Sequence, residues 1–351
     1  MEHYLVVGGL GLVGRAVVRA LETRQDVKIT GVSRRTPDFE TRADWLCVDL
    51  TDRRRCEQAF TALSDVTHIV YCALFEQPTL LAGWKDDGQI ATNTLMLENV
   101  LDFVTPRSHL TLLQGTKAYA AHYRPMALPG KESSPRPPGA NFYWNQEDMV
   151  RTRQRGANWH FSIMRPQIVC GVAVGSPMNV VAAFGVYATL MREAGMPCGY
   201  PGGTGFVTET VDADLLARAI LWAGQSERAR NETYNVTNGD VVEWASLWPE
   251  LMAMLDTPVG DAVPRHLRGD MPHFEKEWAA IVARHHLQPL SLQALVGSSW
   301  EFADAVLGTL GGATTLLSTI KLRQHGFADC IDTAEMFRKH FAAMRDARLI
   351  P

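Results

Sequence analysis

The feature that most limits what this chain can fold into is a glycine-rich turn that directly follows its first predicted strand. Residues 4–7 form a short strand-like run, and the sequence continues as Gly8-Gly-Leu-Gly11-Leu-Val-Gly14 into a helical pattern. Small residues at this GxxGxxG spacing let the backbone turn tightly, admit a phosphate group and pack the helix on the strand. The free N–H groups and the dipole at the start of such a helix attract a pyrophosphate. The turn is therefore typical of a dinucleotide-binding site.

Short β-branched runs alternate with helical patterns over the first 170 residues. The predicted strands are 4–7, 27–32, 44–48, 68–72, 110–114 and 161–165, and the predicted helices are 13–23, 54–62, 92–104 and 146–156. This alternation predicts βαβ units and therefore an α/β fold with a Rossmann-type doubly wound parallel sheet. A helix over 212–222 and a strand over 232–236 are expected to return to that sheet.

The residues at the end of the second predicted strand distinguish between two dinucleotides. An acidic residue there binds the ribose 2′-hydroxyl of NAD, whereas arginine binds the 2′-phosphate of NADP. This chain has Arg34 and Arg35 and no acid at that position, which favours NADP. Asp49, after the third strand, is expected to accept a hydrogen bond from the adenine amino group. Tyr71 to Ala73 are expected to run beside the ribose and pyrophosphate.

The strand-helix alternation weakens after residue 172, and helical patterns dominate from residue 244 onward. We therefore expect a smaller, mostly helical substrate-binding lobe beside the sheet. The predicted division is an NADP-binding Rossmann domain over 1–172, to which 208–236 returns, and a second lobe formed by 173–207 and 237–351.

Composition and charge argue against several other classes of protein. Lys and Arg total 34 and Asp and Glu total 38, and the formal net charge of -4 offers no footprint for nucleic acid or an anionic membrane. The six cysteines form no CxxC pair, which favours reduced thiols. The longest apolar runs are too short to span a membrane, and no signal peptide is recognised. We expect a cytoplasmic protein with a small-molecule partner.

Metal and hydrolase chemistry are both disfavoured. His266, His273, His285 and His286 gather in one region, but adjacent histidines on a helix point in different directions and no carboxylate spacing completes a metal site. We therefore predict no metal. The GxSxG pattern that presents a nucleophilic serine is also absent from the sequence.

Four tyrosines are candidates for a proton donor of the short-chain dehydrogenase type, namely Tyr71, Tyr119, Tyr123 and Tyr143. Most such enzymes place a lysine four residues after the tyrosine on one helix, where it lowers the pKa of the phenol and holds the nicotinamide ribose. None of the four tyrosines has a lysine at that spacing. This chemistry is therefore either lost or supplied by a lysine from another element.

Several short motifs, spread over nearly the whole chain, occur together in one order. They are Gly8 to Gly14, Gly31-Val-Ser-Arg-Arg35, Asp65-Val-Thr-His68, Asn99-Val-Leu-Asp102, Asn141-Phe-Tyr143 with Glu147-Asp148, Arg165-Pro166, Ser176 with Met178-Asn179, and His325-Gly-Phe327. The sequence in this respect resembles the atypical extended short-chain dehydrogenases that include progesterone 5β-reductase and iridoid synthase. Members of that family reduce enones with NADPH.

The resemblance implies that the catalytic lysine and tyrosine come from separate elements. In that family the lysine follows the fifth strand in a QTGxKHY-like segment, which matches Lys117, and the tyrosine is the first of an NFYY segment, which matches Tyr143. Leu113 and Gln114 depart from this pattern because they take the places of the family's Gln and Thr. Trp144 replaces the second tyrosine, a change that keeps the acid and leaves its effect on the pocket open.

The resemblance also implies which residues contact the cofactor, NADPH or NADP+. Together with the residues inferred above, they are Gly8, Leu10, Gly11, Leu12, Gly14, Arg34, Arg35, Asp49, Leu50, Ala73, Gln114, Tyr143, Val169, Ser176 and Met178. Phe302 resembles an aromatic residue that lines the family's substrate pocket.

The activity that the resemblance implies is hydride transfer from NADPH to the activated C=C bond of a small lipophilic enone. The Tyr143 hydroxyl would hold the enolate oxygen, with Lys117 nearby. The same two residues could serve direct reduction of a ketone or aldehyde, so a carbonyl reductase is the alternative. A non-catalytic NADP-binding sensor is a second alternative, which the presence of both residues disfavours. Extended members of the superfamily often dimerise, which leaves a homodimer open.

Overall fold

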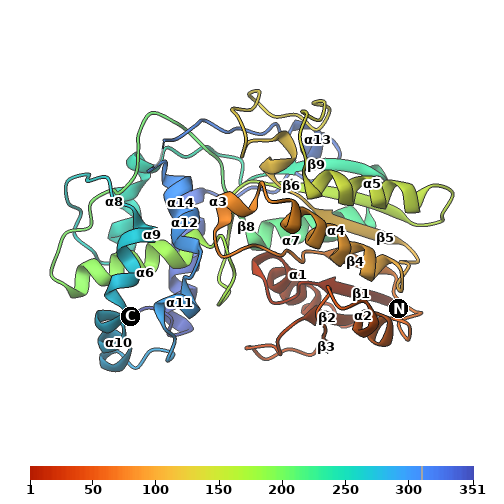
Figure 1. The fold of residues 1–351 in the computed structure, drawn as a ribbon, viewed down its shortest axis with the longest axis horizontal. Coiled ribbons are helices and arrows are strands. Elements are labelled where there is room, and N and C mark those ends of the chain that lie inside the picture. Colours follow the sequence, from red (N-terminus) through yellow and green to blue (C-terminus); the bar gives the residue numbers. More distant parts are fainter. Residues whose placement is uncertain (310) are drawn as a thin grey trace.

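The computed structural model describes residues 1–309 and 311–351, and places a sheet-based part beside a helical lobe (Figure 1). Leu310, which falls within the predicted second lobe, lies outside the described residues. The strands are β1 (Glu2–Val7), β2 (Val27–Ser33), β3 (Asp44–Cys47), β4 (His68–Tyr71), β5 (His109–Leu113), β6 (His160–Pro166), β7 (Val169–Cys170), β8 (Val211–Asp212) and β9 (Glu232–Val236).

The helices fall into two groups along the chain. Those that accompany the sheet strands are α1 (Leu12–Glu22), α2 (Arg53–Phe60), α3 (Leu80–Gly83), α4 (Asp87–Leu101), the 3-10 helix η1 (Thr116–Tyr119), α5 (Phe142–Gln154), α7 (Ala213–Gln225) and η2 (Glu227–Ala229). The others are α6 (Val180–Glu193), α8 (Trp244–Met254), α9 (Leu267–Asp270), η3 (Met271–Phe274), α10 (Glu275–Arg284), α11 (Leu292–Leu295), α12 (Ser299–Leu307) and α14 (Thr333–Asp346), whereas α13 (Ile320–Gln324) packs against β9 of the sheet.

Within the described residues, seven parallel strands form one sheet in the order β3-β2-β1-β4-β5-β6-β9. The chain first builds outward from β1 to β3 and then crosses back to build from β4 to β9. The direction therefore reverses between β1 and β4, and α/β proteins bind ligands at the carboxyl ends of the strands at such a point. The predicted doubly wound parallel sheet is confirmed, including the return of residues 232–236 as β9.

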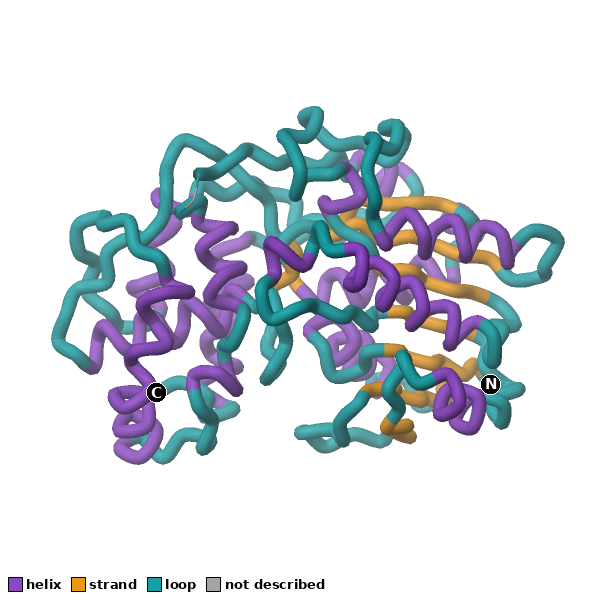
Figure 2. Tube along the Cα trace, in the orientation of Figure 1, coloured by secondary structure: helices purple, strands orange, loops and turns teal. Residues whose placement is uncertain are grey.

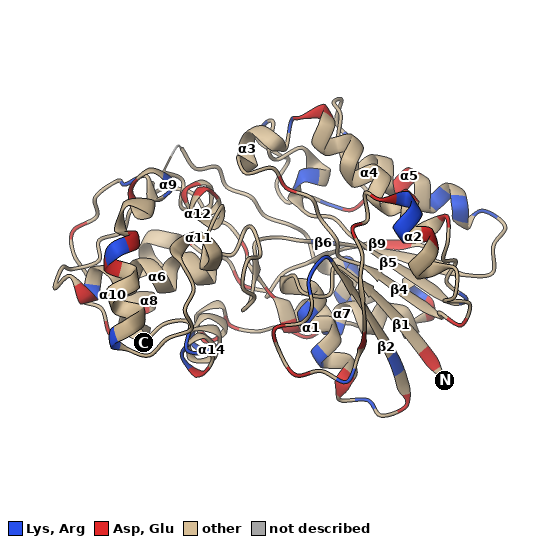
Figure 3. Ribbon diagram, turned by 60° about the horizontal axis from the view of Figure 1, so that its bottom comes forward, with Lys and Arg blue, Asp and Glu red and all other residues tan. Residues whose placement is uncertain are grey.

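The central strands of the sheet are largely apolar because helices cover both faces of the sheet (Figure 3). In β1, Tyr4 and Val6 pack in the core that contains α1 and α7. Leu5 and Val7 point to the opposite face and pack in the core that contains α2, α4 and α5. Successive side chains of β1 thus point to opposite faces of the sheet. The carboxyl end of the strand, and the glycine turn that follows it, therefore lie between the two layers of helices.

Two helices begin earlier than the sequence predicts, because polar side chains cap them. α4 begins at residue 87 rather than 92, where the Asp86 carboxylate accepts a 2.8 Å hydrogen bond from the Gln89 amide. α5 begins at residue 142 rather than 146, where the Asn141 side chain accepts a 3.0 Å hydrogen bond from the Tyr143 amide. Such caps satisfy N–H groups that have no partner within the helix. The cap on α5 places Tyr143 in the first turn of that helix.

The helical lobe packs around α6, and Figure 2 shows its helices set apart from the strands. Residues 180–191 of α6 are all buried, because the helix is surrounded by others on every side. The Phe184 ring lies 5.7 Å from Trp244 and 5.5 Å from Trp248 of α8, and 6.0 Å from Phe337 of α14, measured between centroids. The residue boundaries of the two predicted domains stay a prediction.

The short pair β7 and β8 was not predicted from the sequence. These strands pair in parallel, Val169 with Val211 and Cys170 with Asp212. Two residues carry too little periodicity to be recognised as a strand. The pair ties the segment after β6 to the start of α7.

Residues 1–309 and 311–351 contain neither a membrane-spanning helix nor a cluster of metal-ligating side chains. No helix in these ranges is long and apolar enough to cross a membrane. In the same ranges, no group of three or more His, Cys, Asp and Glu side chains is placed to hold a metal ion.

Candidate active site

A cavity of 1050 Å³ opens at the carboxyl ends of the sheet strands. This volume is at the upper end of the range for ligand pockets, so the cavity has room for a large ligand. All the residues predicted for the site line it, namely Gly8, Leu10, Gly11, Leu12, Gly14, Arg34, Arg35, Asp49, Leu50, Ala73, Gln114, Lys117, Tyr143, Val169, Ser176, Met178 and Phe302. The fold therefore collects residues from distant parts of the sequence around one space.

The glycine turn fits a phosphate group by its shape. Gly8 has a φ of +87°, and a Cβ there would lie 2.7 Å from the Ala73 nitrogen. A Cβ on Gly14 would lie 2.2 Å from the Gly8 carbonyl oxygen. Gly11 begins α1 without a side-chain cap, so the first N–H groups of the helix are left for a ligand. The turn can therefore hold the pyrophosphate of a dinucleotide.

The rim of the cavity after β2 and β3 is charged. Arg34 and Arg35 are exposed there, and the Arg35 guanidinium donates to the Val174 carbonyl oxygen at 3.3 Å. The Asp49 carboxylate accepts hydrogen bonds from the Thr51 amide at 3.0 Å and from its hydroxyl at 2.8 Å. These hydrogen bonds, of which the one from the Thr51 amide has the larger effect, hold the pKa of Asp49 below its usual range. Asp49 is thus an acceptor at neutral pH, as contact with an adenine amino group requires.

Lys117 projects from η1 into a cage of aromatic rings. Its Nζ lies 4.5 Å from the ring centroid of Trp84 and 5.6 Å from those of Phe142 and Tyr143. The same atom donates to Glu76 Oε1 at 3.2 Å. Burial lowers the pKa of Lys117, against the opposing effect of the Glu76 charge. The structure thus brings Lys117 and Tyr143 together, although 26 sequence positions separate them.

Tyr143 presents its hydroxyl to the cavity. A Cβ added to Gly115 would lie 3.6 Å from that oxygen, so the absence of a side chain at this position leaves space beside it. No hydrogen bond to the hydroxyl is found among the described residues. Burial, and then the negative charge of Glu76, raise the pKa of Tyr143 well above its usual value. The phenol is therefore protonated at neutral pH and available to a ligand.

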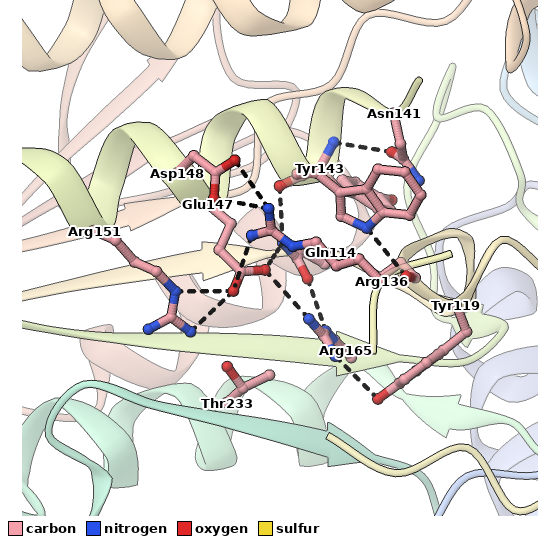
Figure 4. Close-up of polar contacts among 12 residues, drawn as sticks. Gln114, Tyr119, Arg136, Asn141, Tyr143, Glu147, Asp148, Arg151, Arg165 and Thr233 are labelled. Carbon is pink, nitrogen blue, oxygen red and sulfur yellow. Dashed lines mark hydrogen bonds and ion pairs between the residues drawn. The ribbon is translucent and has the colours of Figure 1, made fainter. Parts of the chain in front are cut away.

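The amide of Gln114 is bound within a buried polar network between α5 and the sheet (Figure 4). Its Nε2 donates to the Tyr143 carbonyl oxygen at 3.0 Å and to Glu147 at 3.1 Å. Its Oε1 accepts from Arg165 Nε at 2.8 Å. Contact between Gln114 and a cofactor stays a prediction, and the structure limits it to the atoms outside this network. The network also fixes the first turn of α5.

Trp144, which takes the place of the family's second tyrosine, is not among the described residues that line the cavity. Its indole Nε1 donates to the Ala118 carbonyl oxygen at 3.1 Å instead. Consecutive residues of a helix point about 100° apart, so a Tyr143 that faces the cavity turns Trp144 toward η1.

The opposite wall comes from segments that the sheet does not contain. Val169 belongs to β7, Phe302 belongs to α12, and Ser176 and Met178 lie in the segment before α6. Met178 has a φ of +60°, in the left-handed region that a non-glycine residue rarely adopts. Strained backbone of this kind is concentrated at functional sites.

Glu76 and Trp84 are site residues that sequence reasoning missed. Glu76 contacts Lys117 directly, and Trp84 lines the cavity and stacks against the same ammonium group. One signal could have found Glu76: it is an acidic residue that follows Phe75, shortly after the carboxyl end of a buried strand. Functional residues of α/β sheets gather at that edge.

The class of protein is shown by a family model that matches residues 4–237, described as the NAD dependent epimerase/dehydratase family. The chain belongs to that family. It is 31% identical to the (S)-8-oxocitronellyl enol synthase of Antirrhinum majus, over 99% of this chain and 92% of that protein. It is 27% identical to the 3-oxo-Delta(4,5)-steroid 5-beta-reductase of Arabidopsis thaliana, over 99% of this chain and 92% of that protein. These similarities confirm the resemblance inferred from the motifs.

Solved structures show the same fold. The UDP-glucose 4-epimerase of Thermus thermophilus, in complex with NAD, superposes with a TM-score of 0.69 at 19% identity, over 99% of this chain and 100% of that one. A UDP-glucose 4-epimerase of Thermotoga maritima gives the same TM-score at 17% identity, over 98% and 99% of the two chains. At these identities the likeness concerns the fold alone.

Proposed function

We propose that this chain is an NADPH-dependent reductase that transfers hydride to the activated C=C bond of a small lipophilic enone. The observation that carries the proposal is the meeting of Lys117 and Tyr143 in the wall of the cavity that also contains the glycine turn and Arg34. The relatives named as an enol synthase and a steroid 5-beta-reductase support it over the full length of the chain. A non-catalytic NADP-binding sensor would not need Lys117 and Tyr143, so their presence favours an enzyme.

The chemistry that a bound reduced nicotinamide supplies is hydride transfer. As the β-carbon of an enone accepts a hydride, its carbonyl oxygen gains the negative charge of an enolate. The Tyr143 hydroxyl, which its raised pKa keeps protonated, donates a hydrogen bond to that oxygen. Lys117 has two N–H donors beyond its bond to Glu76, which are available to polar groups of a ligand bound beside Tyr143. A proton taken up at the α-carbon completes the saturated carbonyl compound.

Apolar side chains support a lipophilic substrate. Leu74 and Leu81, from the segment after β4, line the cavity with Phe206, Phe302 and Val306 on the lobe side. Burial of apolar surface against such walls stabilises an apolar ligand by about 25 cal/mol per Å². Polar groups at the same end then orient the substrate carbonyl rather than supply most of the affinity.

The proposed activity predicts saturated carbonyl products from enones. Purified protein is incubated with NADPH and progesterone, 2-cyclohexen-1-one or 8-oxogeranial, while absorbance follows NADPH oxidation and mass spectrometry identifies the product. Allylic alcohol as the product, or turnover of the saturated counterparts alone, would move the assignment to carbonyl reduction. Tight NADPH binding without any turnover would count against the proposal and for the sensor.

Arg34→Ala is expected to weaken NADPH binding by ~10- to 100-fold, because a charged hydrogen bond to the 2′-phosphate contributes about 1.5–3 kcal/mol. Binding of NADH, which lacks that phosphate, is expected to be unchanged. Fluorescence titration of both cofactors measures the two effects. Arg54→Ala, an exposed arginine on α2, is the matched control. Equal losses for NADPH and NADH would exclude a contact to the 2′-phosphate.

The cellular setting and assembly are part of the proposal. Within the described residues, all six cysteines are free thiols, which supports a reducing, cytoplasmic compartment. The homodimer stays a prediction, and light scattering of the purified protein tests it.

A further inference from the structure

The buried carboxylate of Glu76 is hydrogen-bonded to Lys117. Glu76 lies between β4 and α3, and its side chain is 3% exposed. One oxygen accepts from Lys117 Nζ at 3.2 Å. The other accepts from Trp84 Nε1 at 3.1 Å and from Gln89 Nε2 at 2.6 Å. Both oxygens of the carboxylate therefore have fixed donors.

The segment that carries Glu76 is itself anchored to α4. The Asn93 side chain accepts from the Phe75 amide and donates to the Phe75 carbonyl oxygen, each at 2.8 Å. Gln89, one turn earlier, accepts from the Gln77 amide at 2.9 Å. Gln89 and Asn93 are fully buried. Glu76 is thus part of a preformed support for the cavity wall, unlike a carboxylate in a mobile surface pair.

The charges around Tyr143 make Glu76 important for its protonation. Of the titratable groups on neighbouring elements, Lys117, Lys85 and His122 line the cavity, and Glu76 contacts Lys117 from outside that lining. Burial, followed by the two lysine charges, lowers the pKa of His122 to about 4, so this group is neutral at pH 7. Lys85 is exposed to solvent, which screens its charge. The close charges beside the phenol are therefore those of the Glu76–Lys117 pair.

The titratable groups between α5 and the sheet form a set separate from the Glu76–Lys117 pair. Glu147 and Arg165 pair at 3.2 Å, and Arg136 and Arg151 also contact Glu147. Tyr119 donates to Asn235 at 2.6 Å and contacts Arg165. The charged groups of this set pair with one another, and none of these pairs involves Glu76 or Lys117.

We propose that Glu76 is a positioning residue: its carboxylate holds Lys117 in the aromatic cage and cancels the lysine charge beside Tyr143, so that the Tyr143 hydroxyl remains a hydrogen-bond donor. The inference rests on the proposed function and deepens it. Reduction needs a donor toward the substrate oxygen, whereas alcohol oxidation needs the phenolate as a base. An unpaired lysine would favour the phenolate. The Glu76–Lys117 pair therefore adapts the site to reduction.

Glu76→Gln tests this role through the pH dependence of enone reduction. Removal of the carboxylate charge favours loss of a proton from the coupled Lys117–Tyr143 pair, so the alkaline limb of kcat/KM is expected to move about one pH unit or more toward neutral pH. Glu76→Asp, which keeps the charge, is expected to move the limb less. Glu98→Gln, on the exposed face of α4, is the matched control and should leave the limb in place. A limb in Glu76→Gln that coincides with that of the wild type overturns the proposal.

A titration of tyrosinate absorbance tests the same proposal without any turnover. Subtracting the curve of Tyr143→Phe from that of the wild type isolates Tyr143, which is expected to titrate above the ordinary value of about 10. A wild-type transition at or below that value overturns the proposal even if Glu76→Gln fails to fold. If no enone is reduced but Tyr143 titrates high and shifts down in Glu76→Gln, the proposed function fails and the role of Glu76 stands. If enones are reduced but Glu76→Gln moves neither the alkaline limb nor the Tyr143 titration, the proposed function stands and the role of Glu76 fails.

Discussion

Tyr143→Phe is expected to lower kcat for enone reduction by about 100-fold, the usual loss when one donor to a developing oxyanion is removed. The phenylalanine keeps the ring that packs 4.5 Å from Phe142, between centroids, and beside the Lys117 ammonium group. The hydroxyl has no hydrogen-bond partner among the described residues, so its removal breaks no internal contact there. The loss should therefore appear mainly in turnover, and the affinity for NADPH, of which Tyr143 is also a predicted contact, should fall by no more than the ~10-fold that one neutral hydrogen bond contributes.

Steady-state rates with the best enone of the panel, together with fluorescence titration of NADPH, measure these two quantities. Tyr123→Phe is the matched control. Tyr123 donates to the Ala140 carbonyl oxygen at 3.2 Å on the surface and is not among the described residues that line the cavity. A Tyr143→Phe protein that turned over as fast as Tyr123→Phe would remove Tyr143 from the mechanism.

The layout of the fold was predictable because it depends on features that act along the chain. The buried strands are apolar on both faces, and the glycine turn after β1 has its own spacing. Parallel strands bring their carboxyl ends to one edge, so the turn, Arg34 and Asp49 were bound to meet there. Helix starts were less predictable, because Asp86 and Asn141 act as caps through their side chains, outside the apolar period.

The interior of the site was only partly predictable, because side-chain direction depends on how loops cross the sheet edge. Lys117 and Tyr143 were identified by resemblance, and their meeting needs the path of the chain after β5. The only sequence signal of Glu76 is its position shortly after a buried strand, and its role becomes clear only from its contact with Lys117. Gln114 matches a cofactor contact in a linear alignment, yet its amide is turned toward α5.

Each residue of the candidate catalytic pair is held by a hydrogen bond with a buried polar side chain at the carboxyl edge of the sheet. Glu76 fixes Lys117 from the segment after β4, and Gln114 fixes the Tyr143 backbone from the end of β5. Gln114 is in turn held by Glu147 and Arg165. Preorganised groups of this kind need not reorganise as charge develops on a substrate. The stability of the network around Gln114 can be tested directly.

Glu147→Gln is expected to lower the free energy of unfolding by about 3 kcal/mol at pH 7, because it leaves a buried guanidinium without a charged partner. Glu147 and Arg165 each have side chains that are 6% exposed, and they lie 3.2 Å apart. In the variant, the acceptors left to Arg165 among the described residues, the Gln114 and Tyr119 oxygens and the new amide oxygen at position 147, are all neutral. Urea unfolding, followed by tryptophan fluorescence, measures the loss.

The effect of Glu147→Gln should also depend on pH. Burial by itself would raise the pKa of Glu147, but the charge of Arg165 and the donors around the carboxylate outweigh it, so the folded pKa lies below the usual value. The charged form therefore contributes stability above the unfolded pKa of about 4.3, and that contribution is lost as pH falls through the folded pKa. The free energies of unfolding of wild type and variant should differ most at neutral pH and converge in acid.

Asp148→Asn is the matched control, because Asp148 is the next residue on α5 but its side chain is 62% exposed in its pair with Arg136. A surface pair of this kind contributes about 0–1 kcal/mol. Equal destabilisation by the two variants would show that the buried pair does not hold α5 in place.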